Sequence, residues 1–334
     1  MRVHILDDWS DTLRGLPGFA RMAGHDVTIW TDHAEGPELA RRLQGAEAIC
    51  LFRERTRITD DLLAALPGLR LISGRGAWPH VDVAACTARG VAFCSHKPAE
   101  APNHAAAELT WALILAAMRD LPGQMASARA GRWQAGVGRT LAGRSIGLYG
   151  YGRIGGLVAR YARAFGCRVI WWGSDAGRAR AQAAGETVAE SRAAFFAQCD
   201  VISLHLRLTP ETTGIITAAD LAQMGPRAVL VNTARAGLIA PGALLAALQA
   251  GRPGLAALDV FDAEPVTDPA DPLLSHPRVI ATPHIGFVTE DEFDLQFRDI
   301  YDQVNAFASG RPQHLVNPGA VAARPAAPPP APPE

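Results

Sequence analysis

The stretch that decides the fold is Ser145-Ile146-Gly147-Leu148-Tyr149-Gly150-Tyr151-Gly152-Arg153-Ile154-Gly155-Gly156. Residues 146–149 are typical of a short buried strand, and Gly150-x-Gly152-x-x-Gly155 follows directly, ahead of an Ala/Arg-rich helical segment. This order of strand, glycine turn and helix predicts a unit that binds a dinucleotide. Gly150 would permit the tight turn, Gly152 the approach of a pyrophosphate, and Gly155 the packing of helix on strand. The N–H groups at the start of the helix would face the phosphates.

On both sides of this stretch, short apolar runs alternate with helical segments, which favours an α/β fold with mostly parallel sheets. The expected strands are residues 3–6, 27–30, 48–52, 69–73, 91–94, 146–149, 168–172, 201–206, 228–232, 255–260 and 279–282. The expected helices are residues 38–43, 60–66, 105–118, 217–224, 241–250 and 290–308. Leu121-Pro122-Gly123 is expected to end the helix that precedes it.

Composition restricts the class of protein. A chain of 334 residues with 49% hydrophobic and 19% charged residues suggests two globular domains. The net charge of −1 gives no reason to expect a nucleic acid or an anionic membrane as partner, and the longest apolar run, residues 109–118, is too short to span a bilayer. The five cysteines lack the spacing of a metal site and predict reduced thiols in a cytoplasmic protein without a metal.

Candidate catalytic residues follow three successive strands of the second half. Arg235 follows the strand at 228–232, Glu264 the strand at 255–260, and His284 the strand at 279–282. The carboxyl ends of parallel strands share one edge of the sheet, so these side chains would meet there. Arg235 would bind a carboxylate and polarise a carbonyl, His284 would exchange a proton, and Glu264 would orient the imidazole and favour its charged form. Taken singly, Arg235 is better explained as a surface loop charge, Glu264 as a turn residue and His284 as a capping histidine.

Together with the glycine motif, these segments resemble the D-isomer-specific 2-hydroxyacid dehydrogenase family. The resemblance covers residues 1 to about 318 and rests on several ordered motifs: Gly150-x-Gly152-x-x-Gly155, Asp200-Val201-Ile202-Ser203-Leu204-His205, Leu208-Thr209-Pro210-Glu211-Thr212, Val231-Asn232-Thr233-Ala234-Arg235, Leu258-Asp259-Val260-Phe261, Glu264-Pro265 and Thr282-Pro283-His284-Ile285-Gly286. It implies an α/β fold of two Rossmann-like domains, in which a doubly wound NAD(P)-binding domain is inserted in a flavodoxin-like substrate domain. We expect residues 100–288 to form the NAD(P)-binding domain, residues 1–99 plus 289–318 the substrate domain, and residues 319–334 a disordered Pro/Ala-rich tail.

The resemblance also implies an activity and a site. The family's catalytic arginine, glutamate and histidine fall on Arg235, Glu264 and His284, and its nicotinamide-carboxamide aspartate falls on Asp259. An NAD(P)-dependent oxidoreductase would transfer a hydride between nicotinamide and a D-2-hydroxy acid/2-oxo acid pair, as a homodimer. The expected coenzyme contacts are Gly150, Gly152, Arg153, Ile154, Gly155, Ser174, His205, Thr233, Ala234, Asp259 and Gly286.

Two places depart from the family pattern. Members that bind NAD end the second Rossmann strand with an aspartate, whereas this chain has Gly173 there, so the choice between NAD and NADP stays open. If the coenzyme is NAD, Asp175 would reach a hydroxyl of its ribose. If the coenzyme is NADP, Ser174 and Arg178 would instead hold its 2′-phosphate.

The second departure is the substrate loop, which reads Ser73-Gly74-Arg75-Gly76-Ala77-Trp78-Pro79-His80. The backbone N–H groups of Arg75, Gly76 and Ala77 are the expected substrate contacts, while Trp78 and Pro79 reshape the wall of the pocket. The side chain of Arg75 either adds a charge to the pocket or bridges to another loop. His80 and His96 are expected to be structural.

Two other functions fit the same motifs. Some relatives are nucleotide-sensing corepressors that bind partner peptides and keep the catalytic residues. A dehydrogenase for formate or phosphite is a further alternative, although formate oxidation needs no proton removed from oxygen, which weighs against it when Glu264 and His284 are both present. The sequence does not identify the 2-hydroxy acid or the physiological direction.

Overall fold

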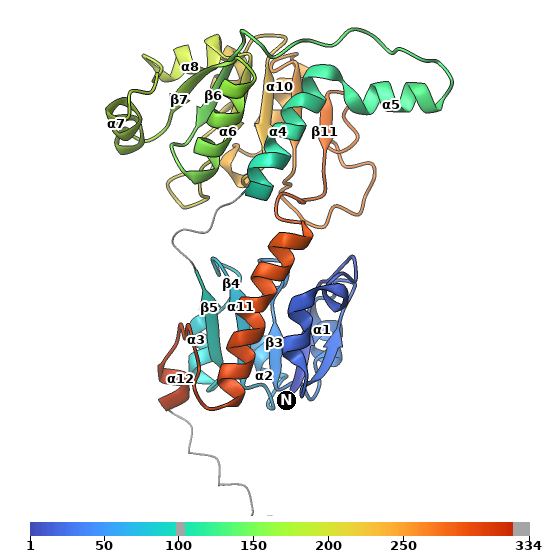
Figure 1. Cartoon of the computed structure of the whole chain (residues 1–334), viewed down its shortest axis with the longest axis vertical. Coiled ribbons are helices and arrows are strands. Elements are labelled where there is room, and N and C mark those ends of the chain that lie inside the picture. The colour runs from blue at the N-terminus through green and yellow to red at the C-terminus, as the bar shows by residue number, and fades with distance from the viewer. Residues whose placement is uncertain (98–103, 323–334) are drawn as a thin grey trace, which may run out of the picture. The chain divides into compact units, whose positions relative to one another are not determined.

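The computed structural model describes residues 1–97 and 104–322, which fold into two compact units (Figure 1). Unit 1 comprises Met1–Ala101 with Thr289–Glu334, and unit 2 comprises Pro102–Val288. The chain therefore leaves unit 1 once and returns to it at Thr289. The domain boundary expected between residues 99 and 100 lies outside the described residues.

Unit 1 is built on a five-stranded sheet in the order β2-β1-β3-β4-β5, with every pair of neighbours parallel. Its strands are β1 (Arg2–Ile5), β2 (Asp26–Ile29), β3 (Ala48–Cys50), β4 (Leu71–Arg75) and β5 (Ala92–His96). Its helices are η1 (Leu13–Gly15), η2 (Pro17–Met22), α1 (Gly36–Arg42), α2 (Asp60–Ala64), α3 (Val83–Ala88), α11 (Glu290–Ala308) and α12 (Gly319–Ala322). This strand order is that of the flavodoxin-like fold, which confirms the prediction.

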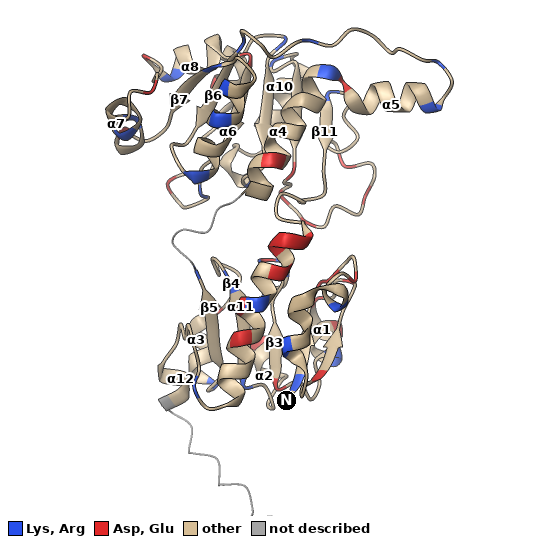
Figure 2. Ribbon diagram, viewed as in Figure 1, with Lys and Arg blue, Asp and Glu red and all other residues tan. Residues whose placement is uncertain are grey.

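The helix after the last strand of unit 2 belongs to unit 1. α11 begins after Thr289, whose side chain accepts from Glu292 N at 3.2 Å, and its first turn is acidic, as suits the positive end of a helix (Figure 2). The ring of Phe52 lies 4.7 Å from that of Phe293 and 4.8 Å from that of Phe297. The apolar stripe of α11 is thus buried within unit 1.

Unit 2 is built on a six-stranded parallel sheet in the order β11-β10-β9-β8-β6-β7. Its strands are β6 (Ser145–Tyr149), β7 (Arg168–Trp172), β8 (Val201–Leu204), β9 (Val229–Asn232), β10 (Leu255–Leu258) and β11 (Val279–Ala281). Its helices are α4 (His104–Arg119), α5 (Leu121–Arg129), α6 (Arg153–Ala164), α7 (Asp175–Ala183), α8 (Arg192–Gln198), α9 (Ala218–Gln223), η3 (Ala236–Leu238) and α10 (Ala243–Gln249). Val188 adds one parallel bridge to Trp171, in the place of a third Rossmann strand.

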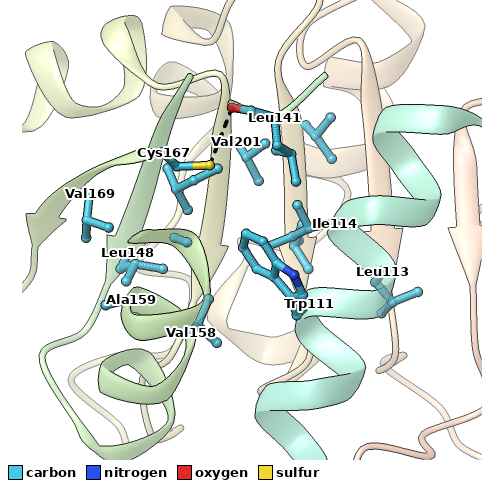
Figure 3. Packing of buried hydrophobic residues seen from close by; sticks show 14 of the residues in the cluster. Trp111, Leu113, Ile114, Leu141, Leu148, Val158, Ala159, Cys167, Val169 and Val201 are labelled. Atoms are coloured by element: carbon cyan, nitrogen blue, oxygen red, sulfur yellow. Dashed lines mark hydrogen bonds between the residues drawn. The ribbon is translucent and has the colours of Figure 1, made fainter. Parts of the chain in front are cut away.

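Apolar helices cover both faces of this sheet, as the prediction of a doubly wound domain requires. On one face, Trp111 and Ile114 of α4 pack with Val158 of α6 and Leu148 of β6 (Figure 3). The cluster on the other face is formed mainly by α8, α9 and α10 against the opposite side chains of the same strands. The strands whose carboxyl ends carry the candidate site are therefore packed on both faces. Among the residues that the structure describes, no helix has the length and apolarity needed to cross a membrane.

Two expectations were wrong, one about the end of a helix and one about the C-terminal tail. Leu121-Pro122-Gly123 ends no helix but opens α5, because α4 already ends at Arg119 and Asp120 (φ +48°) turns the chain and accepts from Gly123 N at 3.3 Å. A proline is well tolerated in the first turn of a helix. Residues 319–322, expected in the disordered tail, form α12, in which Ala320 is buried. The rest of that tail, residues 323–334, lies outside the described residues.

Candidate active site

The glycine turn joins β6 to α6 at the point where the strand order of unit 2 reverses. At Gly150 (φ +115°), an added Cβ would lie 2.5 Å from the carbonyl oxygen of His205, and at Gly155 it would lie 2.8 Å from that of Gly150. Packing within the protein therefore requires both glycines. At Gly152, by contrast, an added Cβ would meet no atom within 4 Å, so the protein leaves open space there.

The first turn of α6 lacks a capping side chain, because Gly152 is its N-cap. The N–H groups of Arg153 and Ile154 are in that turn and have no intrahelical acceptor. Open space over Gly152 and the backbone N–H groups of a helix N-terminus behind it are what a pyrophosphate needs, so this turn fits the phosphates of a dinucleotide.

The carboxyl ends of β8 and β9 follow next along the same edge of the sheet. His205, just beyond β8, donates its backbone N–H to Tyr149 O at 2.8 Å, and its Nε2 lies 3.0 Å from Ser203 Oγ. Burial lowers the pKa of His205 to about 4, so its ring is neutral at physiological pH. Beyond β9, Asn232 accepts from Ala234 N at 3.0 Å and donates to Arg235 O at 2.9 Å. This amide clamp fixes the conformation of the loop that carries the candidate Arg235.

Asp259 follows β10 and holds the loop that follows β11. Its Oδ1 accepts from Thr282 Oγ1 at 2.6 Å and from Ile285 N at 2.8 Å, and its Oδ2 accepts from Gly286 N at 2.8 Å. Burial raises the pKa of Asp259, although these three donors stabilise its charged form. In this structure Asp259 therefore positions the residues on either side of His284.

The candidate acid/base pair is in contact. His284 Nδ1 lies 2.5 Å from Glu264 Oε2, and the other carboxylate oxygen, Oε1, accepts from Phe261 N at 2.8 Å. Burial alone would raise the pKa of Glu264, but the hydrogen bond and the charge of His284 outweigh it and lower that pKa. His284 has φ +52°, a conformation that few histidines adopt, and the three donors of its loop hold it there. With Nδ1 engaged, Nε2 is the ring nitrogen available for proton exchange.

Arg235 follows β9, the strand beside β10. Its Nη1 donates to Ala234 O at 2.7 Å, and its positive charge contributes to the lowered pKa of Glu264. Beside it, Thr233 Oγ1 lies 2.6 Å from Thr110 Oγ1 of α4. The three candidate catalytic residues thus follow three adjacent strands, as their sequence positions predict.

The expected substrate loop belongs to unit 1, but its first three residues, Ser73, Gly74 and Arg75, form the end of β4, so the loop begins at Gly76. Arg75 Nε lies 2.6 Å from Asp299 Oδ2 of α11, and the same oxygen lies 2.8 Å from His96 Nδ1. The N–H of Gly76 donates to His96 O at 2.9 Å, which occupies one of the expected backbone donors. Trp78 packs edge-on against Phe93, with 5.8 Å between ring centroids, so its half-buried ring lies against the core of unit 1. The side chain of Arg75 is thus engaged in a bridge to a helix.

Sequence reasoning missed the residues that hold these loops in place. Asn232 hydrogen-bonds to Ala234 and Arg235, and Thr282 hydrogen-bonds to Asp259. Both therefore position candidate site residues without being candidates themselves. An asparagine at a strand end, followed two residues on by the N–H it binds, is the signal of an Asx turn, and it is visible in the motif Asn232-Thr233-Ala234. The bond from Thr282 to Asp259 spans 23 residues, and no local pattern indicates it.

Comparison with known proteins identifies the family. The model of the "D-isomer specific 2-hydroxyacid dehydrogenase, NAD binding domain" matches residues 111–286, which include the glycine turn and the ends of β9, β10 and β11. The chain belongs to this family. The coenzyme of the family is a nicotinamide dinucleotide, in agreement with the fit of the turn between β6 and α6.

Relatives in the 2-hydroxyacid dehydrogenase family carry several names. The chain is 36% identical over 298 residues to D-3-phosphoglycerate dehydrogenase of Mycobacterium tuberculosis, covering 88% of this chain and 55% of that protein. It is 34% identical to glyoxylate reductase of Aeropyrum pernix, covering 88% and 90% of the two chains. The crystal structure of a phosphoglycerate oxidoreductase from Vibrio cholerae matches with a TM-score of 0.88 and 42% identity over 93% of this chain and 99% of that one. The chain spans about half the length of the mycobacterial D-3-phosphoglycerate dehydrogenases it matches.

Proposed function

We propose that the chain is an NAD(P)-dependent D-2-hydroxyacid dehydrogenase that interconverts a 2-oxo acid and a D-2-hydroxy acid. The observation that carries the proposal is the contact of His284 Nδ1 with Glu264 Oε2, beside the strand end that bears Arg235. An imidazole held by a carboxylate on one nitrogen and available on the other is an acid/base group. An arginine is the side chain best suited to a planar carboxylate.

The coenzyme would be held by the turn between β6 and α6, with its phosphates over Gly152 and at the N–H groups of Arg153 and Ile154. His205, Thr233, Ala234 and Gly286 lie at or near the carboxyl ends of neighbouring strands and would line the rest of its site. Asp259 would accept from the carboxamide only if one of its carboxylate oxygens takes a further donor, since each already accepts at least one. When bound, the nicotinamide supplies or accepts the hydride.

The protein's own residues would then manage charge and protons. The guanidinium of Arg235 binds the substrate carboxylate and polarises the neighbouring carbonyl. His284 donates a proton from Nε2 to the carbonyl oxygen during reduction and takes it back from the hydroxyl during oxidation. Glu264 keeps the proton on Nδ1 throughout, since its lowered pKa leaves it ionised.

In unit 1, the loop after β4 would offer backbone donors to a carboxylate. The N–H of Gly76 is bonded to His96 O and the side chain of Arg75 to Asp299, so we propose Ala77 N as the main donor of this loop. Ala77 is exposed, and no described residue accepts from its N–H. Arg75 would act mainly by holding the loop against α11.

We also propose a homodimer. α5 projects from unit 2 (Figure 1), and it and the chain that follows expose large apolar side chains: Leu121 is 44%, Met125 52%, Trp133 76% and Val137 100% exposed. A contiguous exposed apolar surface is typical of a subunit interface. A second copy of the chain would cover it, and sedimentation velocity of the wild type and of Trp133→Ala/Val137→Ser tests this.

A cytoplasmic location accords with the five cysteines, all of which are buried and unpaired. Burial raises the pKa of these thiols, which keeps them in the unreactive protonated form.

The test of the proposed function is a panel of 2-oxo acids, chosen from the names of the relatives and including glyoxylate and hydroxypyruvate. Oxidation of NADH and NADPH is followed with each acid, and D-3-phosphoglycerate is tested in the reverse direction. Turnover with at least one pair supports the proposal. Tight coenzyme binding without turnover on any acid would instead favour a nucleotide-sensing binding protein.

A further inference from the structure

The carboxyl end of β7 carries charges that the proposed catalysis does not use. This strand end lies beside the glycine turn, since Gly150 N donates to Trp172 O at 2.8 Å. In a Rossmann unit the residue at this end reads the adenosine ribose of the coenzyme, and an acid here selects NAD. Gly173 has no side chain, and from residue 168 to residue 183 the only acid is Asp175.

Asp175 is neutralised by an arginine of its own helix. Arg178 Nη2 lies 2.5 Å from Asp175 Oδ1, and Arg178 Nη1 donates to Gly173 O at 2.6 Å. The guanidinium also stacks over the Trp172 ring, 4.3 Å from its centroid. Three contacts thus fix the Arg178 guanidinium at the end of β7, and its pairing with Asp175 leaves no uncompensated negative charge in the place where members that bind NAD carry one.

A second arginine of α7, two residues after Arg178, approaches the glycine turn. Arg180 Nη2 lies 3.5 Å from Tyr151 O, and Tyr151 is the residue between Gly150 and Gly152. A single contact of this length leaves most of the five N–H donors of the guanidinium available. Basic residues are present on both helices that flank β7, α6 and α7 (Figure 2).

We infer that unit 2 selects NADP(H) over NAD(H), and that Arg178 and Arg180 bind the 2′-phosphate of its adenosine. This inference rests on the coenzyme site of the proposed function and adds the identity of the coenzyme. A phosphate monoester carries a charge of about −1.5 to −2 at neutral pH, and guanidinium groups bind it through paired, charge-assisted hydrogen bonds. The uncharged ribose hydroxyl of NAD(H) gains none of this, and Asp175 is already paired with Arg178.

Equilibrium binding to the full-length protein tests the inference without turnover. Intrinsic tryptophan fluorescence or calorimetry gives Kd for 2′,5′-ADP and 5′-AMP, which differ only in the 2′-phosphate, and for NADPH and NADH. We expect 2′,5′-ADP to bind at least about 10-fold more tightly than 5′-AMP, the scale of one hydrogen-bonded charge pair. Because the extra interaction is between charges, added salt should weaken 2′,5′-ADP binding more steeply than 5′-AMP binding.

Three variants and a control locate the effect. Arg178→Gln and Arg180→Gln should each weaken 2′,5′-ADP by about 10-fold or more while leaving 5′-AMP within about twofold. Ser174→Asp places a carboxylate beside the site yet keeps a residue that caps α7 well, so it should also reverse the preference toward NADH. Arg160→Gln, an exposed arginine in a later turn of α6, is the matched control and should change neither Kd.

The outcomes separate this inference from the function on which it rests. Equal binding of NADPH and NADH, or tighter binding of NADH, overturns NADP selection and leaves the dehydrogenase proposal intact. A preference for 2′,5′-ADP that survives both arginine variants, with circular dichroism showing normal folding, overturns the assignment to these residues. Failure of all four ligands to bind overturns the coenzyme site itself, and the inference with it. The steeper salt dependence of the wild type supports the inference even if a variant does not fold.

Discussion

Replacement of Glu264 by glutamine removes both the charge that holds His284 and one hydrogen-bond acceptor. In the wild type, Oε2 faces His284 Nδ1 at 2.5 Å and Oε1 accepts from Phe261 N at 2.8 Å. A glutamine has one oxygen, so either the imidazole or the backbone N–H must face an NH₂ group. Both side chains are 29% exposed, so solvent screens the pair only in part.

The expected loss can be estimated from that geometry. A hydrogen bond to a charged partner contributes roughly 1.5–3 kcal/mol, which corresponds to about a 10- to 150-fold change. We therefore expect Glu264→Gln to lower kcat/KM for reduction of the best 2-oxo acid by about 10- to 100-fold at neutral pH. The coenzyme Kd should stay within about twofold, because the glycine turn lies on β6 and α6.

The pH profile separates an electrostatic role from a structural one. Reduction takes up the proton that His284 donates, so kcat/KM for reduction should fall toward high pH, and loss of the Glu264 charge should move this fall to lower pH. The pKa of Glu264 is lowered, so the pair is present above the ordinary glutamate value of about 4.3 and is lost only as the pH falls through the lower folded value. Glu264→Asp keeps the charge on a shorter side chain. It is the matched control and should retain the wild-type dependence of kcat/KM on pH. A Glu264→Gln enzyme with normal kcat/KM and an unshifted profile would refute this reasoning.

Three further predictions concern single positions. Arg235→Lys should lower kcat/KM by roughly 2–4 kcal/mol with little change in coenzyme Kd, because an ammonium cannot make a paired contact; near-normal steady-state kinetics would remove Arg235 from the mechanism. Gly152→Ala should keep the wild-type Tm but weaken coenzyme binding by about 10-fold or more. Gly155→Ala should lower the Tm, because its Cβ would lie 2.8 Å from Gly150 O. Thermal melts and coenzyme titrations on both variants test this. Asp259→Asn should destabilise the protein by roughly 1–3 kcal/mol in urea unfolding, since the amide cannot accept from all three donors of the His284 loop; unchanged stability would show that these bonds are replaced by others.

Much of the fold could be predicted from local patterns. The strands are short apolar runs between turn residues, and each of the expected runs overlaps a strand of the structure. Helix caps act within one turn, so their residues lie close together in the sequence: Thr59 accepts from Leu62 N, and Thr217 and Asp220 form a capping box. Glu290–Ala308 is the expected helix with the expected bounds, since its apolar period is regular and Gly310 lies just beyond its end.

The remaining features depend on contacts between distant residues. The sequence motif marks Asp259 as important, but its bonds to Thr282, Ile285 and Gly286 arise only when β10 and β11 lie side by side. The partner of Arg75 is Asp299, which is 224 residues away, so the sequence left two roles open for this arginine. Leu121-Pro122-Gly123 carries signals for both a helix end and a helix start, and the bond from Gly123 N to Asp120 decides for a start.

The central claim is that His284 supplies the proton for reduction of a 2-oxo acid, and single-turnover kinetics of His284→Gln tests it most directly. Enzyme preloaded with reduced coenzyme is mixed with the best 2-oxo acid, and the loss of coenzyme fluorescence reports the chemical step. We expect this step to slow by at least about 100-fold, the lower end of the contribution of a general acid. The coenzyme Kd should be unchanged, and the rate of the step should no longer vary with pH in the range where the wild-type rate does. A His284→Gln variant that reduces the acid at the wild-type rate, with the wild-type pH profile, would contradict the account.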